Sequence, residues 1–574
     1  GKLFHSTIQA IVFANSLVEN GTPQDLEQAE KTIRAVLACQ ETRDQDPHRG
    51  NFLWEQEDKV VEDLNAVQFI LFNLIPILIR WEDRLSNDLN TLIRKAVQLG
   101  LEEIARIDVH PDYTNIVLKD ITNTCLGGEL LQNDKTAARG YDKLVRWMRH
   151  TDKSGIPAEF NSPGYTRIAI KILKCLTDLV EHSPTRFRAR MYVSRLGLSI
   201  ALHISTSTKR WAGPYSRAYL DQVFGDNATA RGVTREAGGG CTELDTILDW
   251  INDGTLPSWL ATVLEIRPTH FRVNETADLK NRVAISTYHT PAYDFGIASQ
   301  ELTTQSNRFI ALQSNTCIAH YTRPDGEPTG LFLSRYLTDD HWVGDYRQTP
   351  SRPASLLAEE GRFHGVQDGP RAIGLYAPRD PGSGDVGADG WNRCHSAKAA
   401  LIWDRADLVD EIWINDHRVT DLPADVPPDA TIVVASGDVL FGIRPLTIQD
   451  LGVGAPIRLI KRHGNLLFEM YNYEGPDKTF WEQALPGSFF QGLPLCGFYL
   501  ELAERSEHPD PAAFCDRVAS GELVESCKAP FTYEEGKERP WKIIYRRDQL
   551  EVGIEVDLMT WKLKRRWNDR KKDA

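Results

Sequence analysis

Apolar residues recur at helical spacing through the first half of the chain. Between Lys59 and Arg80 they follow the i, i+3, i+4 rule of an amphipathic helix with one buried face. Similar segments predict helices over residues 25–40, 59–80, 85–107, 113–131, 136–150, 165–181, 188–203, 214–224 and 244–251. No strand pattern separates them, which excludes a parallel α/β sheet and leaves helical hairpins that close as a bundle, a solenoid or an (α/α) toroid.

The pattern changes near residue 275, where glycine and proline become denser and the apolar period shortens. Short apolar runs bounded by Gly, Pro, Asp or Asn predict strands at 283–288, 308–312, 399–403, 431–434, 439–443, 466–470 and 541–545. We therefore expect a multidomain α + β chain. Residues 1–275 would form a helical (α/α) toroid, and residues 276–574 an antiparallel β-sandwich.

Composition narrows the classes of partner. The 574 residues include 66 Lys and Arg against 80 Asp and Glu, a net charge of −14. Because a nucleic-acid surface needs a concentrated basic face, we expect no nucleic acid as partner. The longest apolar stretch, residues 66–79, is shorter than the ~20 residues of a membrane span, so we expect no membrane helix. Any anionic partner must be bound locally.

Nine cysteines are spread along the chain without a CxxC pair, which argues against a structural zinc and leaves disulfides open. We expect no metal site and no cofactor, with a divalent ion such as calcium left open. Glycosylation triplets begin at Asn20, Asn227 and Asn274, and the chain starts at Gly1. Together these features favour a processed, secreted glycoprotein. We expect a monomer or a homodimer.

Two segments carry a resemblance to polysaccharide lyases. They are residues 159–165, EFNSPGY, and residues 203–219, HISTSTKRWAGPYSRAY. Toroid-plus-sandwich lyases of the heparinase II/III, chondroitin/hyaluronate and alginate/glucuronan types use an Asn, Gln, Glu or Arg against the uronate carboxylate, and a His and a Tyr for proton exchange. The order Asn161, His203 and Tyr215 or Tyr219 is similar to that plan. The resemblance implies cleavage of a uronate-containing polysaccharide, glucuronan- or alginate-like, by β-elimination.

The chemistry of β-elimination explains these residue types. The proton at C5 becomes acidic only when the adjacent carboxylate is neutralised and the developing enolate is held by fixed donors, a role for the Asn161 amide or an Arg fork. A base and an acid must then move protons, which suits His203 and a tyrosine of lowered pKa.

The tyrosines are expected on one helix. Gly213-Pro214 looks like an N-cap followed by the first helical position, so Tyr215 would lie in the first turn and Tyr219 on the same face. Further residues of the same segment would form a local cationic patch for a polyanionic chain. These are Lys209, Arg210 and Arg217.

Other residues are candidates for substrate binding. Glu159 and Tyr165 flank Asn161, and Trp54, near Glu55 and Asp58, offers an aromatic face for a sugar. Tyr288 and His289 lie in the first strands of the sheet half, where the sandwich would close the cleft. Weaker cleft candidates are His341, Trp342 and Arg444.

Each candidate also has a purely structural interpretation. Asn161 and Ser162 could begin a helix as caps, His203 could be a bonded core histidine, and the tyrosines could be packing aromatics. Two other functions stay open. A toroid glycoside hydrolase would need a carboxylate pair, for which the chain offers Asp58, Glu62, Asp63 and Glu159. A glycan-binding protein would use the same aromatics and arginines without catalysis.

Overall fold

The computed structural model describes residues 4–224, 242–302, 313–324, 327–340, 347–349, 352–353, 359–378, 393–446, 456–479, 496–527, 538–558 and 560–568. Helices fill its N-terminal part up to Ile266. They are α1 (Thr7–Asn20), α2 (Pro23–Leu37), α3 (Ala66–Trp81), α4 (Asn87–Ile107), α5 (Thr114–Leu130), α6 (Asp134–Ser154), α7 (Tyr165–Leu179), α8 (Ser183–His203), α9 (Leu220–Phe224), α11 (Glu243–Asn252) and α12 (Trp259–Ile266).

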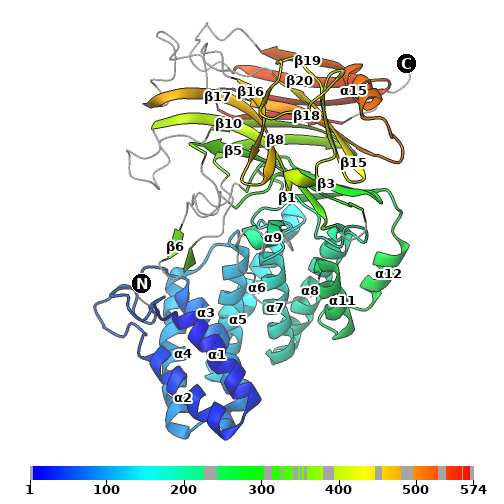
Figure 1. Ribbon diagram of the computed structural model, residues 1–574. Helices are drawn as coiled ribbons and strands as arrows, with labels where there is room; N and C mark the ends of the chain where they lie inside the picture. The colour runs from blue at the N-terminus through cyan, green and yellow to red at the C-terminus, as the bar shows by residue number, and fades with distance from the viewer. Residues whose placement is uncertain are drawn as a thin grey trace.

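The helices are arranged as hairpins around an inner row. In this row α1 packs on α3, α3 on α5 and α5 on α7, while α2, α4, α6 and α8 pack against inner helices from outside. The row is open, because α1 lies at one end of the helical region and α12 at the other (Figure 1). The helical half is thus an open (α/α) toroid with a continuous apolar core.

Antiparallel sheets form the rest. A nine-stranded sheet has the order β1 (Phe271–Asp278), β2 (Val283–His289), β3 (Tyr293–Ala298), β4 (Cys317–Tyr321), β5 (Gly330–Thr338), β10 (Arg393–Trp403), β17 (Asn465–Thr479), β16 (Ile457–Arg462), β13 (Ala424–Asp425). A seven-stranded sheet has the order β12 (His417–Arg418), β11 (Glu411–Ile414), β14 (Ile432–Ser436), β15 (Val439–Pro445), β18 (Cys496–Glu504), β9 (Arg371–Pro378), β8 (Gly361–Asp368).

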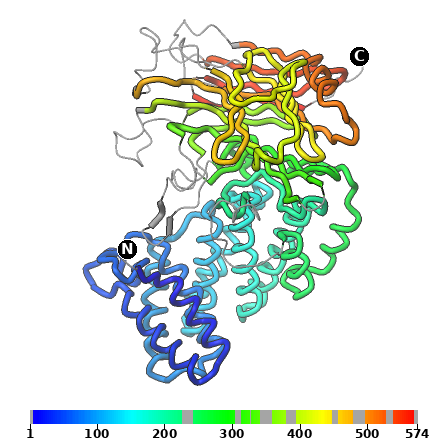
Figure 2. Tube along the Cα trace, in the orientation of Figure 1, coloured from blue at the N-terminus to red at the C-terminus, as the bar shows by residue number. Residues whose placement is uncertain are grey.

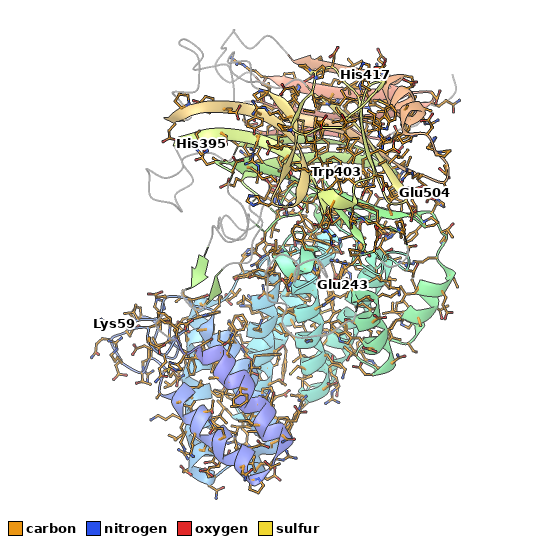
Figure 3. The ribbon with its side chains drawn as sticks, in the orientation of Figure 1. Lys59, Glu243, His395, Trp403, His417 and Glu504 are labelled. Atoms are coloured by element: carbon orange, nitrogen blue, oxygen red, sulfur yellow. The ribbon has the colours of Figure 1, made fainter. Side chains whose placement is uncertain are left out.

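The two large sheets stack face to face. Their shared apolar core includes Trp403, which lies deep in the sandwich (Figure 3). A second core joins the seven-stranded sheet to helix α15 (Pro511–Ala519) and to a four-stranded sheet of β19 (Glu522–Cys527), β20 (Pro540–Arg547), β21 (Leu550–Asp557) and β22 (Lys562–Trp567). A small pair, β6 (Arg347–Thr349) and β7 (Arg352–Pro353), forms a two-stranded sheet of its own. The result is a layered β-sandwich.

The sandwich rests on the helical half (Figure 2). The face of the nine-stranded sheet that turns away from the sandwich core contributes Ile318, Leu333, Ala400 and Ile402 to the apolar core of the helices. A close backbone approach seals one part of this interface, because a Cβ at Gly296 of β3 would collide with the carbonyl of Gly213. Only glycine fits there. The loop that contains Gly213 is therefore held against the sheet.

Most predicted helices and strands are confirmed. Residues 59–65 are not helical, since α3 begins at Ala66. The predicted helix 214–224 is wrong over most of its length. The Gly213–Pro214 peptide is cis, Tyr215 pairs as an isolated bridge with Asn315, and only Leu220–Phe224 is helical. The sequence pattern also missed α1 and α12.

Several predictions lie outside the described residues: the strand 308–312, the triplet at Asn227, Cys241, and His341 with Trp342. Of the cysteines that are described, seven are free thiols, and six of these are buried. Within the described ranges, no helix is both long and apolar enough to cross a membrane.

Candidate functional site

A buried arginine organises the side chains where helices α5 and α7 begin. Arg217 is 3% exposed and donates Nη1 to Glu159 Oε1 at 2.6 Å, Nη2 to the hydroxyl of Tyr165 at 2.7 Å, and Nε to Gln313 Oε1 at 3.0 Å. Its guanidinium also lies over the Tyr165 ring, 3.9 Å from the centroid. All three nitrogens of the guanidinium are thus bound by the protein, so this arginine positions other groups.

Two tyrosines extend this centre towards solvent. The hydroxyl oxygens of Tyr165 and Tyr219 are 3.1 Å apart, and both side chains are half-buried. Burial raises the pKa of Tyr165, although the Arg217 charge favours its phenolate. The chain of contacts Arg217–Tyr165–Tyr219 therefore links a fixed cation to a phenol that solvent reaches.

Glu159 ties the same centre to helix α5. Its carboxylate accepts the backbone N–H of Asn115 at 2.9 Å and the Asn115 side-chain amide at 3.1 Å. Because Asn115 is the second residue of α5, the carboxylate meets unpaired N–H groups and the positive end of the helix dipole. Glu159, predicted as a substrate-binding residue, is instead fully engaged by Arg217 and α5.

A buried lysine lies one helical turn further along α5. Lys119 is 3% exposed, with Nζ 3.5 Å from the carbonyl oxygen of Asn115 and 4.2 Å from the ring centroid of Phe69. Burial lowers the pKa of Lys119 to about 7, although Glu159 favours the charged form. The amine is therefore close to half-protonated near neutral pH.

The predicted aromatic platform lies beyond this lysine. Trp54 is half-buried and packs edge-on against Phe69, with ring centroids 5.7 Å apart. Tyr113, just before α5, has its pKa raised to about 12 by burial, and burial also raises the pKa of Asp63. Contacts thus run from Tyr219 through Arg217, Glu159 and α5 to Trp54.

Asn115, Lys119, Tyr113 and Gln313 were missed by sequence reasoning. A signal was present in α5, because Thr114–Gly128 is buried on every side although the segment carries Asn, Lys, Asp and Thr. Polar side chains in a helix without a solvent face must bond inside the protein. Such a helix is typical of one that crosses a polar centre.

The Asn161 side chain, predicted to face the uronate carboxylate, is hydrogen-bonded within the protein. Its amide nitrogen donates to the carbonyls of Ala212 and Pro214 at 2.8 and 2.9 Å, and its oxygen accepts the indole N–H of Trp211 at 2.6 Å. Both amide hydrogens are used, so none is left for a uronate carboxylate. With a φ of 42°, which asparagine tolerates, the residue clamps the loop before Tyr215.

His203 and Tyr215 are also committed to the fold. His203 is fully buried, with Nε2 2.9 Å from Glu275 Oε2 and Nδ1 3.0 Å from Thr287 Oγ1, so neither ring nitrogen meets a tyrosine. The Tyr215 hydroxyl donates to the carbonyl of Trp211, and burial raises its pKa. The predicted pairing of His203 with Tyr215 is absent from the described contacts, and Tyr215 lies in no helix.

The predicted cationic patch is not assembled around the tyrosines. Arg210 pairs through Nε with Glu243 at 2.9 Å and donates to the carbonyl of Gln222 at 3.0 Å, which binds α9 to α11. Figure 3 labels Glu243 in the helical half. Lys209 is exposed, and of the three predicted cations Arg217 alone contacts Tyr165.

The sheet candidates point to opposite sides. His289 faces the helices and binds Asp294 through Nδ1 at 2.6 Å, while Tyr288, next in the strand, turns towards the sandwich core. Burial lowers the pKa of His289. Arg444 lies in β15 of the other large sheet, where it donates to the carbonyl of Gly521, and so is not on the helix-facing side of the nine-stranded sheet.

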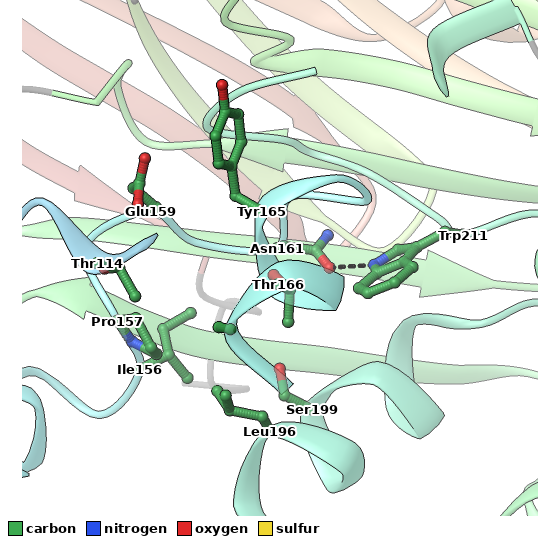
Figure 4. A pocket seen from close by; sticks show the side chains of 11 residues that line it. Thr114, Ile156, Pro157, Glu159, Asn161, Tyr165, Thr166, Leu196, Ser199 and Trp211 are labelled. Carbon is green, nitrogen blue, oxygen red and sulfur yellow. Dashed lines mark hydrogen bonds between the residues drawn. The ribbon is translucent and has the colours of Figure 1, made fainter. Parts of the chain in front are cut away.

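A small pocket opens beside this centre. It holds about 20 Å³, room for one water, and its walls include Glu159, Asn161, Tyr165 and Trp211 (Figure 4). In Figure 4 the oxygens of Glu159 and Tyr165 point to the same side, and the hydrogen bond between Asn161 and Trp211 lies to the right of them. Among the described residues no cluster of three or more His, Cys, Asp or Glu could hold a metal ion.

A family model described as a domain of unknown function, DUF8769, matches residues 1–225, which is less than half of the chain. No curated protein matches. Among solved structures, heparinase III is similar with a TM-score of 0.43 and 9% identity over 96% of this chain and 82% of that one. Heparan sulfate lyase HepC from Pedobacter heparinus is similar with a TM-score of 0.34 and 10% sequence identity, over 99% of this chain and 83% of that one. Scores of this size carry no argument about the reaction.

Proposed function

We propose that the protein is a polysaccharide lyase that cleaves a uronate-containing glycan by β-elimination, with Tyr219 as the proton-transfer residue. The observation that carries the proposal is the hydrogen-bonded chain from the buried Arg217 through Tyr165 to the half-exposed Tyr219. A phenol serves as a base at neutral pH only if its phenolate is stabilised. We assign that task to the Tyr165 hydroxyl, whose oxygen is 3.1 Å from that of Tyr219 and is itself bound by the buried Arg217.

Each residue then has a distinct task. Tyr219 touches substrate and takes or returns the proton. Tyr165 donates a hydrogen bond to the Tyr219 phenolate, while Arg217 fixes Tyr165 and adds its positive charge. Glu159 holds Arg217 in place and joins it to α5, so the site rests on helices rather than on a loose loop. The half-buried Trp54 would contact a sugar further along the chain.

The hydrolase alternative has weaker support. A glycosidase needs two carboxyl groups facing each other across the bond, free to donate and accept protons. Glu159 is paired with Arg217 and accepts the backbone N–H of Asn115. Asp58 accepts the backbone N–H of Glu55 at 2.8 Å. Burial raises the pKa of Asp63. Among its described contacts there is no second carboxylate that could act with it as a catalytic pair.

A panel of glucuronan, alginate, pectate, hyaluronan, chondroitin and heparan sulfate tests the proposal. Ultraviolet absorbance of an unsaturated uronate should appear with one or more of these substrates. New reducing ends without that absorbance would indicate a hydrolase, and binding without either product would indicate a glycan-binding protein. Three further points belong to the same proposal. The panel shows which uronate is preferred, and product sizes distinguish an endo- from an exo-enzyme. The culture fraction that holds the protein shows whether it is secreted.

A further inference from the structure

A second polar pocket lies on the opposite side of the nine-stranded sheet from the Arg217 centre. It has a volume of about 370 Å³, within the range of sites for small ligands. Strands β1, β2 and β3 form one wall, and β8 and β22 form the other. Its lining includes Asn274, Ser286, Gln367, Arg566 and Asn568.

Three polar groups in this pocket have no partner among the residues that the structure describes. No hydrogen bond or ion pair to the Arg566 guanidinium occurs among the described residues, and the same holds for the side-chain amide of Asn274. The hydroxyl oxygen of Ser286 is buried and has no hydrogen-bond partner in the described part of the chain. Asn274 and Ser286 are cross-strand partners in β1 and β2 and so point to the same face.

The local charge is positive in an acidic protein. Burial and the nearby Arg282 guanidinium both lower the pKa of Arg566, so two like charges stand together here. Glu275 lines the pocket too, but its carboxylate turns to the other face of β1 to bind His203 and Ser199. An unpaired, half-buried arginine is costly, and a bound anion would remove that cost.

We propose that this pocket is an accessory site for an acidic sugar, in which Arg566 binds the carboxylate and Ser286 and Asn274 bind ring hydroxyls. A cation beside a hydroxyl and an amide matches a uronate better than a neutral sugar or a bare inorganic anion. The choice of a uronate rests on the proposed function. The site itself, on the far side of the sheet, is independent of catalysis and would hold a distant part of the same polyanionic chain.

Titration calorimetry of the full chain with D-glucuronate tests this site, because a monosaccharide has no bond for a lyase to cleave. D-glucose and sulfate serve as the neutral-sugar and bare-anion probes. Protein from a host without N-glycosylation keeps Asn274 unmodified. We expect Arg566→Gln to remove one class of glucuronate site or to weaken it about tenfold or more, the worth of a charge-assisted bidentate pair.

Matched variants separate this result from unfolding and from the catalytic proposal. Arg565→Gln, on the neighbouring exposed arginine that pairs with Glu555, should bind as the parent does, and Tyr219→Phe should keep the accessory site. The thermal midpoint of Arg566→Gln should not fall, since it relieves repulsion from Arg282. Unchanged glucuronate binding in Arg566→Gln, equal binding of glucose or sulfate, or a lowered midpoint would each overturn the proposal. Absence of any cleavage product would instead count against the lyase.

Discussion

Tyr215 and Tyr219 are four residues apart, yet they belong to regions with opposite uses of their polar groups. Tyr215 lies in a loop clamp, formed by Asn161, His203, Trp211 and Tyr215, in which every hydroxyl, amide and ring nitrogen meets a protein partner. Tyr219 belongs to the Arg217 centre, where the cation and the carboxylate are paired but the outermost phenol stays half-exposed. A cluster whose polar groups all have hydrogen-bond partners stabilises the fold. A catalytic group must instead be positioned by the protein and still be accessible to substrate.

The largest effect should come from the outermost phenol. Tyr219→Phe removes only the hydroxyl, so we expect turnover to fall about 10²- to 10⁴-fold with little change in thermal midpoint. Tyr215→Phe is the matched control. It removes a buried hydrogen bond to Trp211 and should lower stability by about 1 kcal/mol while turnover by the folded enzyme stays near the parent value.

The two variants give a clear decision. Loss of turnover in Tyr215→Phe together with parental turnover in Tyr219→Phe would reverse the assignment of the two regions. Initial rates with the best substrate of the panel and a melting curve for each variant are sufficient measurements.

The next effect concerns the buried pair at the heart of the Arg217 centre. Arg217→Met leaves the buried Glu159 carboxylate without its cation and with only the Asn115 donors, which should cost about 3 to 5 kcal/mol in the free energy of unfolding. The double variant Arg217→Met, Glu159→Met should recover much of that loss and still lack turnover. The exposed pair of Arg94 and Glu82 is the control, since Arg94→Met should cost less than about 1 kcal/mol.

Urea unfolding of the three variants measures these differences. If Arg217→Met costs no more than Arg94→Met, the ion pair does not organise the centre. Full turnover in the double variant would show that the charge on Arg217 is not needed by Tyr219.

Lys119 should make stability depend on pH. Its pKa is about 7 in the folded protein and about 10.4 in an unfolded chain, so between these values the unfolded state binds more protons and stability rises with pH. Below pH 7 both states carry the proton, and the full cost of the buried charge is present. Lys119→Met removes this cost, so at pH 6 we expect it to be more stable than the parent by about 2 to 4 kcal/mol.

That advantage should shrink as the pH rises through 7 and be nearly gone close to pH 10, as followed by urea unfolding across the range. Lys135→Met, at an exposed lysine of α6, should show no such pH dependence. A constant difference between Lys119→Met and the parent at all pH values would contradict a titrating buried amine.

The sequence predicted periodic features well and three-dimensional contacts poorly. Helices α2, α4, α7 and α11 were found because their apolar faces repeat along the chain. Gly213-Pro214 was misassigned because the dipeptide also suits a helix start. In the structure its peptide is cis and Gly213 lies close against Gly296 in β3, a contact that a local sequence pattern does not show.

The same limit applies to the site. The segments around Glu159 and Arg217 were identified, but not that the two residues bind each other across 58 positions. Asn115 and Lys119 were missed because a local pattern treats a polar residue in a helix as exposed, and the all-round burial of α5 arises only when α3, α6 and α7 pack on it.

The smallest effect sharpens the difference between clamp and catalytic centre at Asn161. Asn161→Ala strands the Trp211 indole N–H and two backbone carbonyls, and it places a Cβ-bearing residue without a local hydrogen bond at φ 42°, so stability should fall by about 1 to 3 kcal/mol. Asn161→Gly tolerates that φ and isolates the lost hydrogen bonds. Asn161→Asp keeps the acceptor for Trp211 but loses both donors.

If the residue is a clamp, all three variants retain most of the turnover per folded molecule below their melting temperatures. If its amide neutralises the uronate carboxylate, as the sequence predicted, each variant should lose about 10²-fold or more in turnover, as is usual when one such donor is removed, even where the melting curve is unchanged.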